Sequence, residues 1–515
     1  MKIAITGATG NMGQEAVAQL LKNQKIKLLR LLVLPDDKRG KALLKKHKKD
    51  KNRLQIVWGN IADSQAVQKL IDGCEYVVNM AAVIPPLSDK NPEKAIECNQ
   101  IGVQNLISTI KKVNPSIKLI HISTVALYGN RNSRHPWARI GDPLLVSPFD
   151  IYSASKLRGE FAVLESELEN WVVLRQTAML HKRMLSDNIH DGLMFHTCFN
   201  APLEWVTAHD SGVLIANIIK KDSESPVQNF WKRCFNIGGG LKNQLTGYDT
   251  LNDGFKLIGG STKDFFKPYF NAIRNFHGVW FADYDELDKL FGYISQDTTD
   301  YWREIGRTHK YYAMAKIMPK GLISKLVIQR LFKDDNSPAY WFAHNDEPRL
   351  VAYFGGRYEY LKLKNIEWKD FPLLNEGKDE NGKNIDFAAL KDPKNAILID
   401  YGYDITKPDD KITQADLKNV AAKHAGKFLG SFDGDMYKKQ LWQTQDGEEF
   451  SASAFTVLRA GHWYSSIYKE NTWDFDRLAK NDQIFAQVWL DSHKADECNL
   501  YRFDEKFNAI REENR

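Results

Sequence analysis

The sequence predicts an α/β protein with a doubly wound parallel sheet and a small second lobe, followed by an α+β C-terminal region. Over the first 180 residues, apolar runs alternate with amphipathic helical patterns, which is typical of a parallel sheet covered on both faces. The first apolar run also breaks directly into a glycine-rich turn. After about residue 336 the pattern changes to short aromatic stretches between turn residues, which indicates a different architecture.

Taken in chain order, the apolar runs predict strands at 3–5, 28–34, 54–57, 76–78, 119–122 and 172–174. Helical patterns between them predict helices at 11–21, 64–71, 92–113 and 152–169. In such sheets ligands bind beyond the carboxyl ends of the strands. The loops that follow the predicted strands are therefore the place to look for a site.

The first of these loops has the layout of a phosphate-binding turn. In Thr6-Gly-Ala-Thr-Gly-Asn-Met-Gly13 the glycines are spaced Gly-x-x-Gly-x-x-Gly. Gly7 allows a tight turn, Gly10 lets the backbone approach a pyrophosphate, and Gly13 lets the next helix pack closely on the strand. The free N–H groups at the start of that helix then face the anion.

Composition restricts the class of protein. The chain has 515 residues, 43% hydrophobic and 26% charged, so it is long enough for two or three domains of an ordinary globular protein. It shows no membrane-spanning run and no signal sequence, and we expect a cytoplasmic protein that does not bind a membrane. Five scattered cysteines form no Cys-x-x-Cys pair, so we expect no disulfide framework and no metal site. The net charge of +6 is concentrated at 38–53, where it predicts a solvated helix face and no nucleic-acid site.

Two later loops carry groups with a chemical use. The segment 79–86 contains small residues against which a ligand can lie, and Ser123-Thr-Val-Ala-Leu-Tyr-Gly129 follows the fifth strand. The next helix begins with Tyr152, and Lys156 lies four residues on, so the two share one helix face. A free tyrosine has a pKa near 10, and a cation on the same face favours the phenolate. The hydroxyl of Thr124 can then hold a substrate oxygen.

These residues together resemble the extended short-chain dehydrogenase/reductase family, which includes NAD-dependent epimerases and dehydratases and has a Rossmann-type sheet. The resemblance covers about the first 240 residues. It rests on the glycine turn and on the motifs Gly59-Asn-Ile61, Ala81-Ala82, Asn99, Ser123-Thr124 with Tyr128-Gly129, and Tyr152 with Lys156. It implies that Tyr152 is the general acid/base, that Lys156 lowers its pKa and binds the nicotinamide ribose, and that Thr124 orients the substrate oxygen. It also implies that Asn99 supports the active site.

The resemblance further implies which residues hold the cofactor and the substrate. The cofactor would be held by Gly7, Thr9, Gly10, Asn11, Met12, Gly13, Leu34, Asn60, Ile61, Ala81, Ala82, Tyr152, Lys156 and Thr177. The substrate would meet Val83, Thr124, Val125 and Met179. Asn60 stands where most relatives have Asp, although an amide can still contact the adenine amino group.

The end of the second strand leaves the cofactor open between NAD and NADP. An acid directly at the strand end would accept the ribose hydroxyls of NAD, but Leu34-Pro35 occupy that place. Asp36 or Asp37 can still reach the ribose, and Lys38 or Arg39 can equally take the phosphate of NADP. We expect NAD(P), with a slight preference for NADP.

The remaining chain divides into three predicted units. Residues 1–245 form the cofactor domain with parts of the substrate lobe, 246–335 a helical, basic lobe or linker, and 336–515 the α+β extension. The lobe residues include Met179, Met184, Leu185, Met194, Phe195 and Trp205. Such a stripe is typical of a core, although it also fits an apolar substrate.

The extension predicts short strands at 339–343 and 350–354 and a helix that starts with a capping box at Thr413 and Asp416 and ends near Gly426. Its segments 441–450 and 461–464 resemble a degenerate treble-clef zinc module. Cysteines are missing from the ligand positions near Thr444, Tyr464 and Ile467, so His462 is predicted to be structural.

Three functions are compatible with these residues. The first is an NAD(P)-dependent oxidoreductase that moves hydride between nicotinamide and a carbonyl or secondary alcohol of a largely apolar small molecule, with Tyr152 moving the proton. The second is an NAD-dependent epimerase or dehydratase that acts on a nucleotide sugar. The third is a non-catalytic nucleotide-sensing scaffold. The family resemblance also implies a homodimer through the helices at 92–113 and 152–169, which the extension could block.

Overall fold

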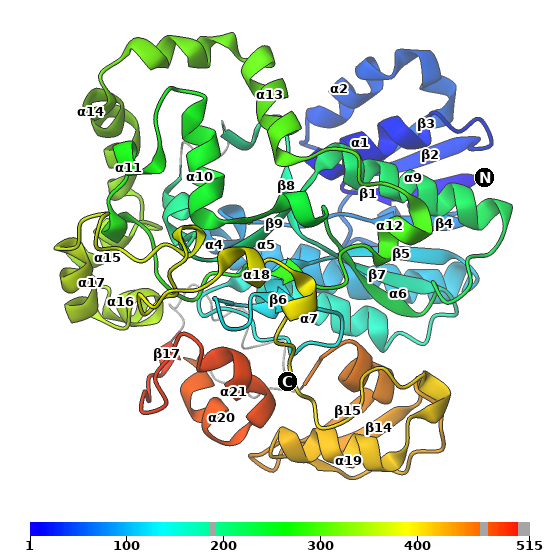
Figure 1. The fold of residues 1–515 in the computed structure, drawn as a ribbon. Coiled ribbons are helices and arrows are strands. Elements are labelled where there is room, and N and C mark those ends of the chain that lie inside the picture. Colours follow the sequence, from blue (N-terminus) through cyan, green and yellow to red (C-terminus); the bar gives the residue numbers. More distant parts are fainter. Residues whose placement is uncertain (186–190, 464–471, 503–515) are drawn as a thin grey trace.

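A computed structural model describes residues 1–185, 191–463 and 472–502. Its centre is a seven-stranded sheet with the order β10-β7-β5-β4-β1-β2-β3 (Figure 1). All neighbouring strands in it are parallel. The strands are β1 (Lys2–Thr6), β2 (Leu28–Val33), β3 (Leu54–Trp58), β4 (Tyr76–Asn79), β5 (Lys118–Thr124), β7 (Trp171–Gln176) and β10 (Arg233–Ile237). The predicted doubly wound parallel sheet is therefore confirmed.

Helices cover both faces of this sheet. One layer holds α1 (Asn11–Leu20) and α9 (Ala208–Glu224), and the other holds α3 (Ser64–Ile71), α6 (Gly102–Val113) and α7 (Ile151–Leu164). Along β1, Ile3 and Ile5 belong to the first hydrophobic cluster and Ala4 to the second. Alternate residues of a central strand thus supply two cores, which is why these strands are continuous apolar runs. Outside this pair of layers, α2 (Arg39–Lys46) follows β2.

The second lobe contains a three-stranded sheet of order β11-β9-β8 and a set of short helices. The strands are β8 (Ala178–Leu180), β9 (Pro202–Thr207) and β11 (Gln244–Thr246), and β6 (Trp137–Ala138) pairs with β12 (Trp280–Phe281). The helices are α10 (Gly247–Lys256), α11 (Thr262–Phe265), α12 (Glu286–Phe291), α13 (Thr298–Thr308) and α14 (Lys320–Ile323). Phe195 is fully buried among Phe266, Phe270 and Phe332, and Met184 is buried beside Trp302. This part of the predicted apolar stripe therefore forms packed core.

The two short strands predicted after residue 336 are wrong. The chain forms three helices there instead, α15 (Pro338–Ala343), α16 (Glu347–Phe354) and α17 (Arg357–Lys364). Ser337 and Asp346 cap the first two helices through their side chains, and each of these two helices has a proline in its first turn. Capping side chains and an early proline favour a helix start, and they decided the conformation of short runs whose aromatic content alone suggests a strand.

The rest of the C-terminal region is α+β, as predicted. It contains α18 (Phe387–Leu390), α19 (Gln414–Lys423), the antiparallel strands β13 (Lys427–Phe428), β14 (Lys439–Gln443) and β15 (Glu449–Ser453), then β16 (Thr472–Trp473), α20 (Phe475–Asn481), α21 (Gln483–Trp489) and β17 (Tyr501–Arg502). The capping box of Thr413 and Asp416 is present. Ala425, one residue before the predicted stop at Gly426, takes the left-handed conformation that ends the helix region.

The C-terminal region packs directly on the α/β domain. Residues of α19, β14, α20 and α21 share one hydrophobic cluster with α3, α6 and α7. Figure 1 shows this region, in yellow to red, lying beside the helix layer that contains α7. In the described parts of the chain, no helix has the length and apolar character needed to cross a bilayer.

Candidate active site

The glycine turn between β1 and α1 is built for a close approach to its backbone. Gly7 has φ 68°, and a Cβ there would lie 2.6 Å from the backbone carbonyl of Met80. A Cβ on Gly13 would lie 2.2 Å from the carbonyl oxygen of Gly7. Gly10 caps α1 without a side-chain hydrogen bond, and the first turn of the helix contains no acid. The N–H groups at residues 11 and 12 can therefore face an anion, as expected for a dinucleotide pyrophosphate.

The structure separates the two acids that follow β2. Asp37 lies against the glycine turn, where the Thr9 hydroxyl donates to it at 2.7 Å, and Arg39 pairs with it at 2.8 and 3.0 Å. The hydrogen bond from Arg39 is the largest cause that lowers the Asp37 pKa, to about 2, against a smaller opposing effect of burial. Asp36 and Leu34 are exposed. Asp37 is thus the charged acceptor beside the turn.

The motif Gly59-Asn-Ile61 after β3 contacts the helical segment that contains Glu97 and Gly102. The Asn60 amide donates to Glu97 at 2.9 Å, and its carbonyl accepts from the backbone N–H of Ala62 at 3.1 Å. Ile61 is buried, and a Cβ on Gly102 would meet its side chain at 2.3 Å. The contacts of Asn60 and Ile61 with an adenine therefore stay predictions.

The turn after β4 is fixed by two buried asparagines. Asn79 accepts the Thr6 hydroxyl at 2.6 Å, and the backbone N–H of Ala81 donates to that hydroxyl at 3.1 Å. Asn99 bonds both backbone groups of Val83 at 2.9 Å and donates to Ser155 of α7 at 3.0 Å. Val83 thus lies at a fixed distance from the start of α7, while Ala82 is exposed.

Asn99 reaches both elements because its helix is locally widened. The predicted helix at 92–113 is present as α5 (Pro92–Ile96), the π-helical turn η2 (Glu97–Ile101) and α6. Such a turn inserts one residue into the helical repeat and is frequent at functional sites. No residue pattern in the sequence indicated this π-helical turn.

Thr124, Tyr152 and Lys156 come together at the carboxyl end of β5. Thr124 ends β5 and Tyr152 lies in the first turn of α7, close enough for the Thr124 side chain to lower the Tyr152 pKa. Burial raises the Tyr152 pKa to about 12, which the Thr124 side chain only partly opposes. Burial also lowers the Lys156 pKa to about 8, and its ammonium donates to the carbonyl of Ile122 at 2.6 Å. The predicted lowering of the Tyr152 pKa by Lys156 stays a prediction.

The remaining predicted residues lie at the junction of the two lobes. The Thr177 hydroxyl donates to the carbonyl of Glu204 at 2.8 Å, which ties the end of β7 to β9. Met179 is half-buried in β8 and pairs with Val206. Val125 is buried in a cluster with Leu127 and Phe281, so it contributes to packing.

Helix α7 is anchored from the far end of the chain. Glu160, four residues after Lys156, is fully buried and accepts from Arg175 at 2.6 Å and from His462 at 3.0 Å. Arg175 also donates to the carbonyl of Ala460 at 2.6 Å and to the Tyr128 hydroxyl at 2.8 Å. His462 was predicted to be structural, and its contacts are of that kind. Its partner 302 residues away could not be read from the sequence.

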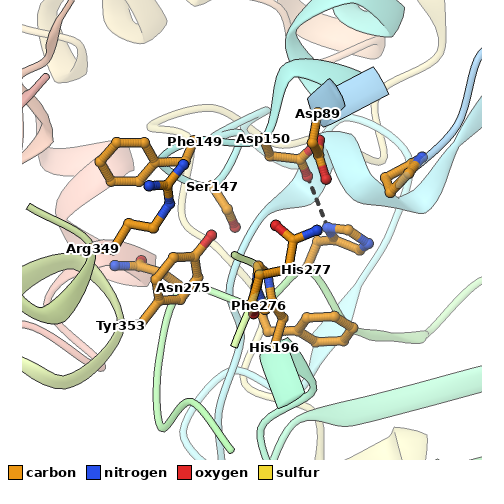
Figure 2. A pocket seen from close by; sticks show the side chains of 12 residues that line it. Asp89, Ser147, Phe149, Asp150, His196, Asn275, Phe276, His277, Arg349 and Tyr353 are labelled. Atoms are coloured by element: carbon orange, nitrogen blue, oxygen red, sulfur yellow. Dashed lines mark hydrogen bonds and ion pairs between the residues drawn. The ribbon is translucent and has the colours of Figure 1, made fainter. Parts of the chain in front are cut away.

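Sequence reasoning missed a small cavity of about 50 Å³ beside the N-terminus of α7 (Figure 2). Asp150 caps α7 and pairs with His277 at 2.9 Å. Burial would raise the Asp150 pKa, but the hydrogen bond and charge of His277, with Ser153, hold it below its ordinary value. Ser147 and Asn275 also line the cavity. The Ser147 hydroxyl and the Asn275 amide oxygen are buried, and neither has a hydrogen-bond partner among the residues that the structure describes.

The cavity wall combines both lobes and the C-terminal region. Figure 2 shows Arg349 and Tyr353 of α16 on one side and Asp89 of α4 (Leu87–Lys90) on the other. The described residues contain no group of three or more His, Cys, Asp or Glu side chains suited to a metal ion. The treble-clef positions at Tyr464 and Ile467 lie outside the described residues.

Comparison with known proteins gives one family match and several partial likenesses. Residues 3–178 match the model of the NAD dependent epimerase/dehydratase family. An uncharacterized membrane protein of Methanocaldococcus jannaschii is 33% identical over 129 residues, 22% of this chain and 37% of that protein. The dTDP-4-dehydrorhamnose reductase of Mycolicibacterium smegmatis is 32% identical over 124 residues, 24% of this chain and 36% of that protein. The chain thus spans little more than a third of either curated relative.

Among solved structures, a double mutant of dTDP-glucose 4,6-dehydratase from Streptomyces venezuelae, determined with NAD bound, is 20% identical with a TM-score of 0.49. The likeness covers 61% of this chain and 100% of that one. The family match itself begins in β1 and ends in β8, so it contains the glycine turn, Thr124, Tyr152 and Lys156. Over residues 3–178, the α/β domain of this chain is therefore similar to the NAD-dependent epimerase/dehydratase family.

Proposed function

We propose that this chain is an NAD-dependent oxidoreductase of the extended short-chain type, with Tyr152 as its general acid/base. The observation that carries the proposal is the grouping of Thr124, Tyr152 and Lys156 at the same edge of the sheet as the glycine turn. This grouping supports proton transfer beside a bound dinucleotide, because an open α/β sheet binds ligands at this edge.

The cradle fits a dinucleotide on three features of this chain. Side chains are excluded at Gly7 and Gly13, the start of α1 is uncapped, and a carboxylate lies beside the turn. When bound there, a nicotinamide accepts or donates a hydride. In the oxidative direction, the alcohol O–H proton passes to the Tyr152 phenolate while the C–H hydrogen leaves with its electron pair, which gives a ketone. Thr124 holds the substrate oxygen.

The ammonium of Lys156 supports this proton transfer only after a rearrangement. It is buried and faces the Ile122 carbonyl, and Tyr152 in the protein alone has a pKa of about 12. A positively charged nicotinamide beside the phenol would favour the phenolate. Proton abstraction is therefore expected to depend on the bound oxidised cofactor.

The position of Asp37 supports NAD, in place of the slight preference for NADP that the sequence suggested. A carboxylate at the turn accepts ribose hydroxyls and repels a 2′-phosphate. Arg39, the residue that could take this phosphate, is already paired with Asp37. This pairing therefore disfavours NADP.

For the substrate we favour a hydroxylated molecule such as a nucleotide-linked sugar over an apolar one. The apolar stripe that suggested the latter is largely core. The cavity beside α7 is lined by Asp150, His277 and two buried polar atoms that bond to no other described residue. The similar dTDP-4-dehydrorhamnose reductase of Mycolicibacterium smegmatis acts, by its name, on such a sugar derivative. The alternative reaction is an epimerase or dehydratase cycle, in which the hydride returns to the same substrate.

Two measurements test the proposal. Denaturing the purified protein and quantifying the released nucleotide distinguishes the reactions, since near-stoichiometric NAD favours an epimerase or dehydratase and exchangeable NAD a dehydrogenase. Tyr152→Phe should keep NAD binding and lose nearly all turnover. Turnover retained in that variant would show that another group moves the proton, and failure of the wild type to bind any nicotinamide nucleotide would leave only the scaffold function.

A further inference from the structure

The segment from Arg307 to Lys333 combines a run of basic residues with exposed apolar side chains. It contains seven basic residues and no acidic one: Arg307, Lys310, Lys316, Lys320, Lys325, Arg330 and Lys333. All seven side chains are exposed. Lys320 pairs with Asp264, and within the described residues no ion pair involves the other six. The segment is therefore a concentrated positive surface.

Large apolar side chains are exposed on the same segment. They are Tyr311 (58%), Met314 (69%), Ile317 (87%), Met318 (40%), Leu322 (42%), Leu326 (49%) and Val327 (38%). Single exposed apolar residues are ordinary, but a run of this kind marks an interaction site. We call residues 307–333 the basic-apolar arch. Figure 1 shows it at the rim of the molecule, between α13 and the turns that follow α14.

The arch is packed against the second lobe through its buried side chains, so it is a folded part of the surface. Ile323, Ile328 and Leu331 are buried in the aromatic cluster of the second lobe. Tyr312 packs against the cluster that contains Trp302 and Met184. The short helices therefore keep one side in the lobe and leave the other to solvent.

We propose that the basic-apolar arch docks this protein on the surface of an anionic phospholipid membrane. Basic side chains near such a surface are attracted by its negative potential, and apolar side chains beside them enter the headgroup and acyl boundary. A nucleic acid would match the charge but would leave Ile317 and Met314 in water. The segment is interrupted by Pro319 and Gly321 and has no spanning length, so docking is peripheral.

The proposal adds to the proposed function and does not depend on it. It revises the sequence-based expectation of no membrane contact, which rested on the missing spanning run and signal sequence. The arch was visible in the sequence only as a basic helical stretch. Which apolar residues are buried and which are exposed became clear from the packing of Ile323 and Ile328.

Co-sedimentation of the full chain with vesicles tests the proposal without any substrate. We expect binding to vesicles of phosphatidylcholine mixed with phosphatidylserine, weakened by added salt, and little binding to phosphatidylcholine alone. Ile317→Ser together with Met314→Ser should weaken binding at least about tenfold, because two exposed apolar side chains no longer enter the bilayer. The matched control is Ile397→Ser, another exposed isoleucine outside the arch (56%), which should bind as the wild type does.

Charge is tested in the same assay. Lys316→Gln with Lys325→Gln should weaken binding about tenfold and reduce its salt dependence. Lys45→Gln with Lys46→Gln, in the other basic segment, is the control and should change binding little. Equal losses in test and control variants, or equal binding to both kinds of vesicle, would overturn the proposal. The proposal would also be overturned if the wild type bound no vesicles and the Ile317 variant instead changed from a dimer to a monomer. Loss of RNA binding in that variant, again with no vesicle binding by the wild type, would overturn it in the same way.

Discussion

Asp37 gives the sharpest test of how this protein selects its cofactor. Asp37→Asn keeps the shape of the side chain and removes the charge. A hydrogen bond to a charged group contributes about 1.5–3 kcal/mol, so loss of the acceptor should weaken NAD binding about tenfold to a hundredfold. The same change removes the ion pair of Arg39 at 2.8 Å and the repulsion of a 2′-phosphate. Binding of NADP should therefore be unchanged or tighter.

The assay is titration of the purified variants with NADH and NADPH, followed by nicotinamide fluorescence. Asp36→Asn is the matched control, since this neighbouring acid is exposed and should leave both affinities as they are. Charge reversal of Lys38 and Arg39 would weaken NADP selectively if the phosphate site suggested by the sequence is used. The reasoning is refuted if Asp36→Asn costs as much NAD affinity as Asp37→Asn, or if Asp37→Asn costs none.

Three further predictions follow from buried groups. His462→Ala should lower the free energy of unfolding by about 1.5–3 kcal/mol, because the buried Glu160 carboxylate loses one of its two hydrogen-bonding partners, and NAD affinity should stay unchanged; urea unfolding and titration measure both. Burial lowers the His196 pKa to about 4. Below pH 6.5 this imidazole is therefore protonated in the unfolded chain and stays neutral in the folded chain. Lowering the pH from 7 to 5 should therefore reduce the free energy of unfolding by about 2 kcal/mol through His196. His196→Gln should make the free energy of unfolding depend less on pH over this range. Phe455 contacts Trp171 and His462 contacts Phe161 of α7, so the C-terminal region covers the face that a dimer through α7 would use. We therefore expect light scattering to give the mass of a single chain, and the mass of a dimer would show that α7 still pairs.

The strands and the glycine turn could be predicted because local sequence decides them. Buried parallel strands are continuous apolar runs, and the structure extends five of the six strands predicted for the parallel sheet by at most about two residues at either end, whereas β2 is one residue shorter. Gly7 and Gly13 were predicted from the needs of a tight turn, and the Cβ contacts at both positions agree. The helix predicted at 152–169 ends at Leu164, because Glu167 takes the left-handed conformation, φ 59°, before β7. Nothing in its apolar spacing indicated that stop.

The predictions that failed were decided partly by local helix caps and partly by contacts between distant segments. Whether the aromatic runs near Trp341 and Tyr353 are strands or helices was decided by their caps and by the aromatic stacking of these two rings. The choice between Asp36 and Asp37 depends on which one reaches Thr9, 28 residues away. The cavity beside α7 joins residues from Pro85 to Tyr353, so no single stretch could have shown it.

The anchoring of α7 has a consequence for the order in which the protein is made. A ribosome releases Thr124, Tyr152 and Lys156 early, and the strands and helices around them can assemble while the chain is still growing. Glu160 and Arg175, however, can form their hydrogen bonds with His462 and Ala460 only after these residues emerge, about 300 residues later. Until then a buried charged pair lacks part of its hydrogen bonding. The nascent α/β domain is therefore expected to reach its final packing only once the segment that contains Ala460 and His462 has been made and has docked on α7.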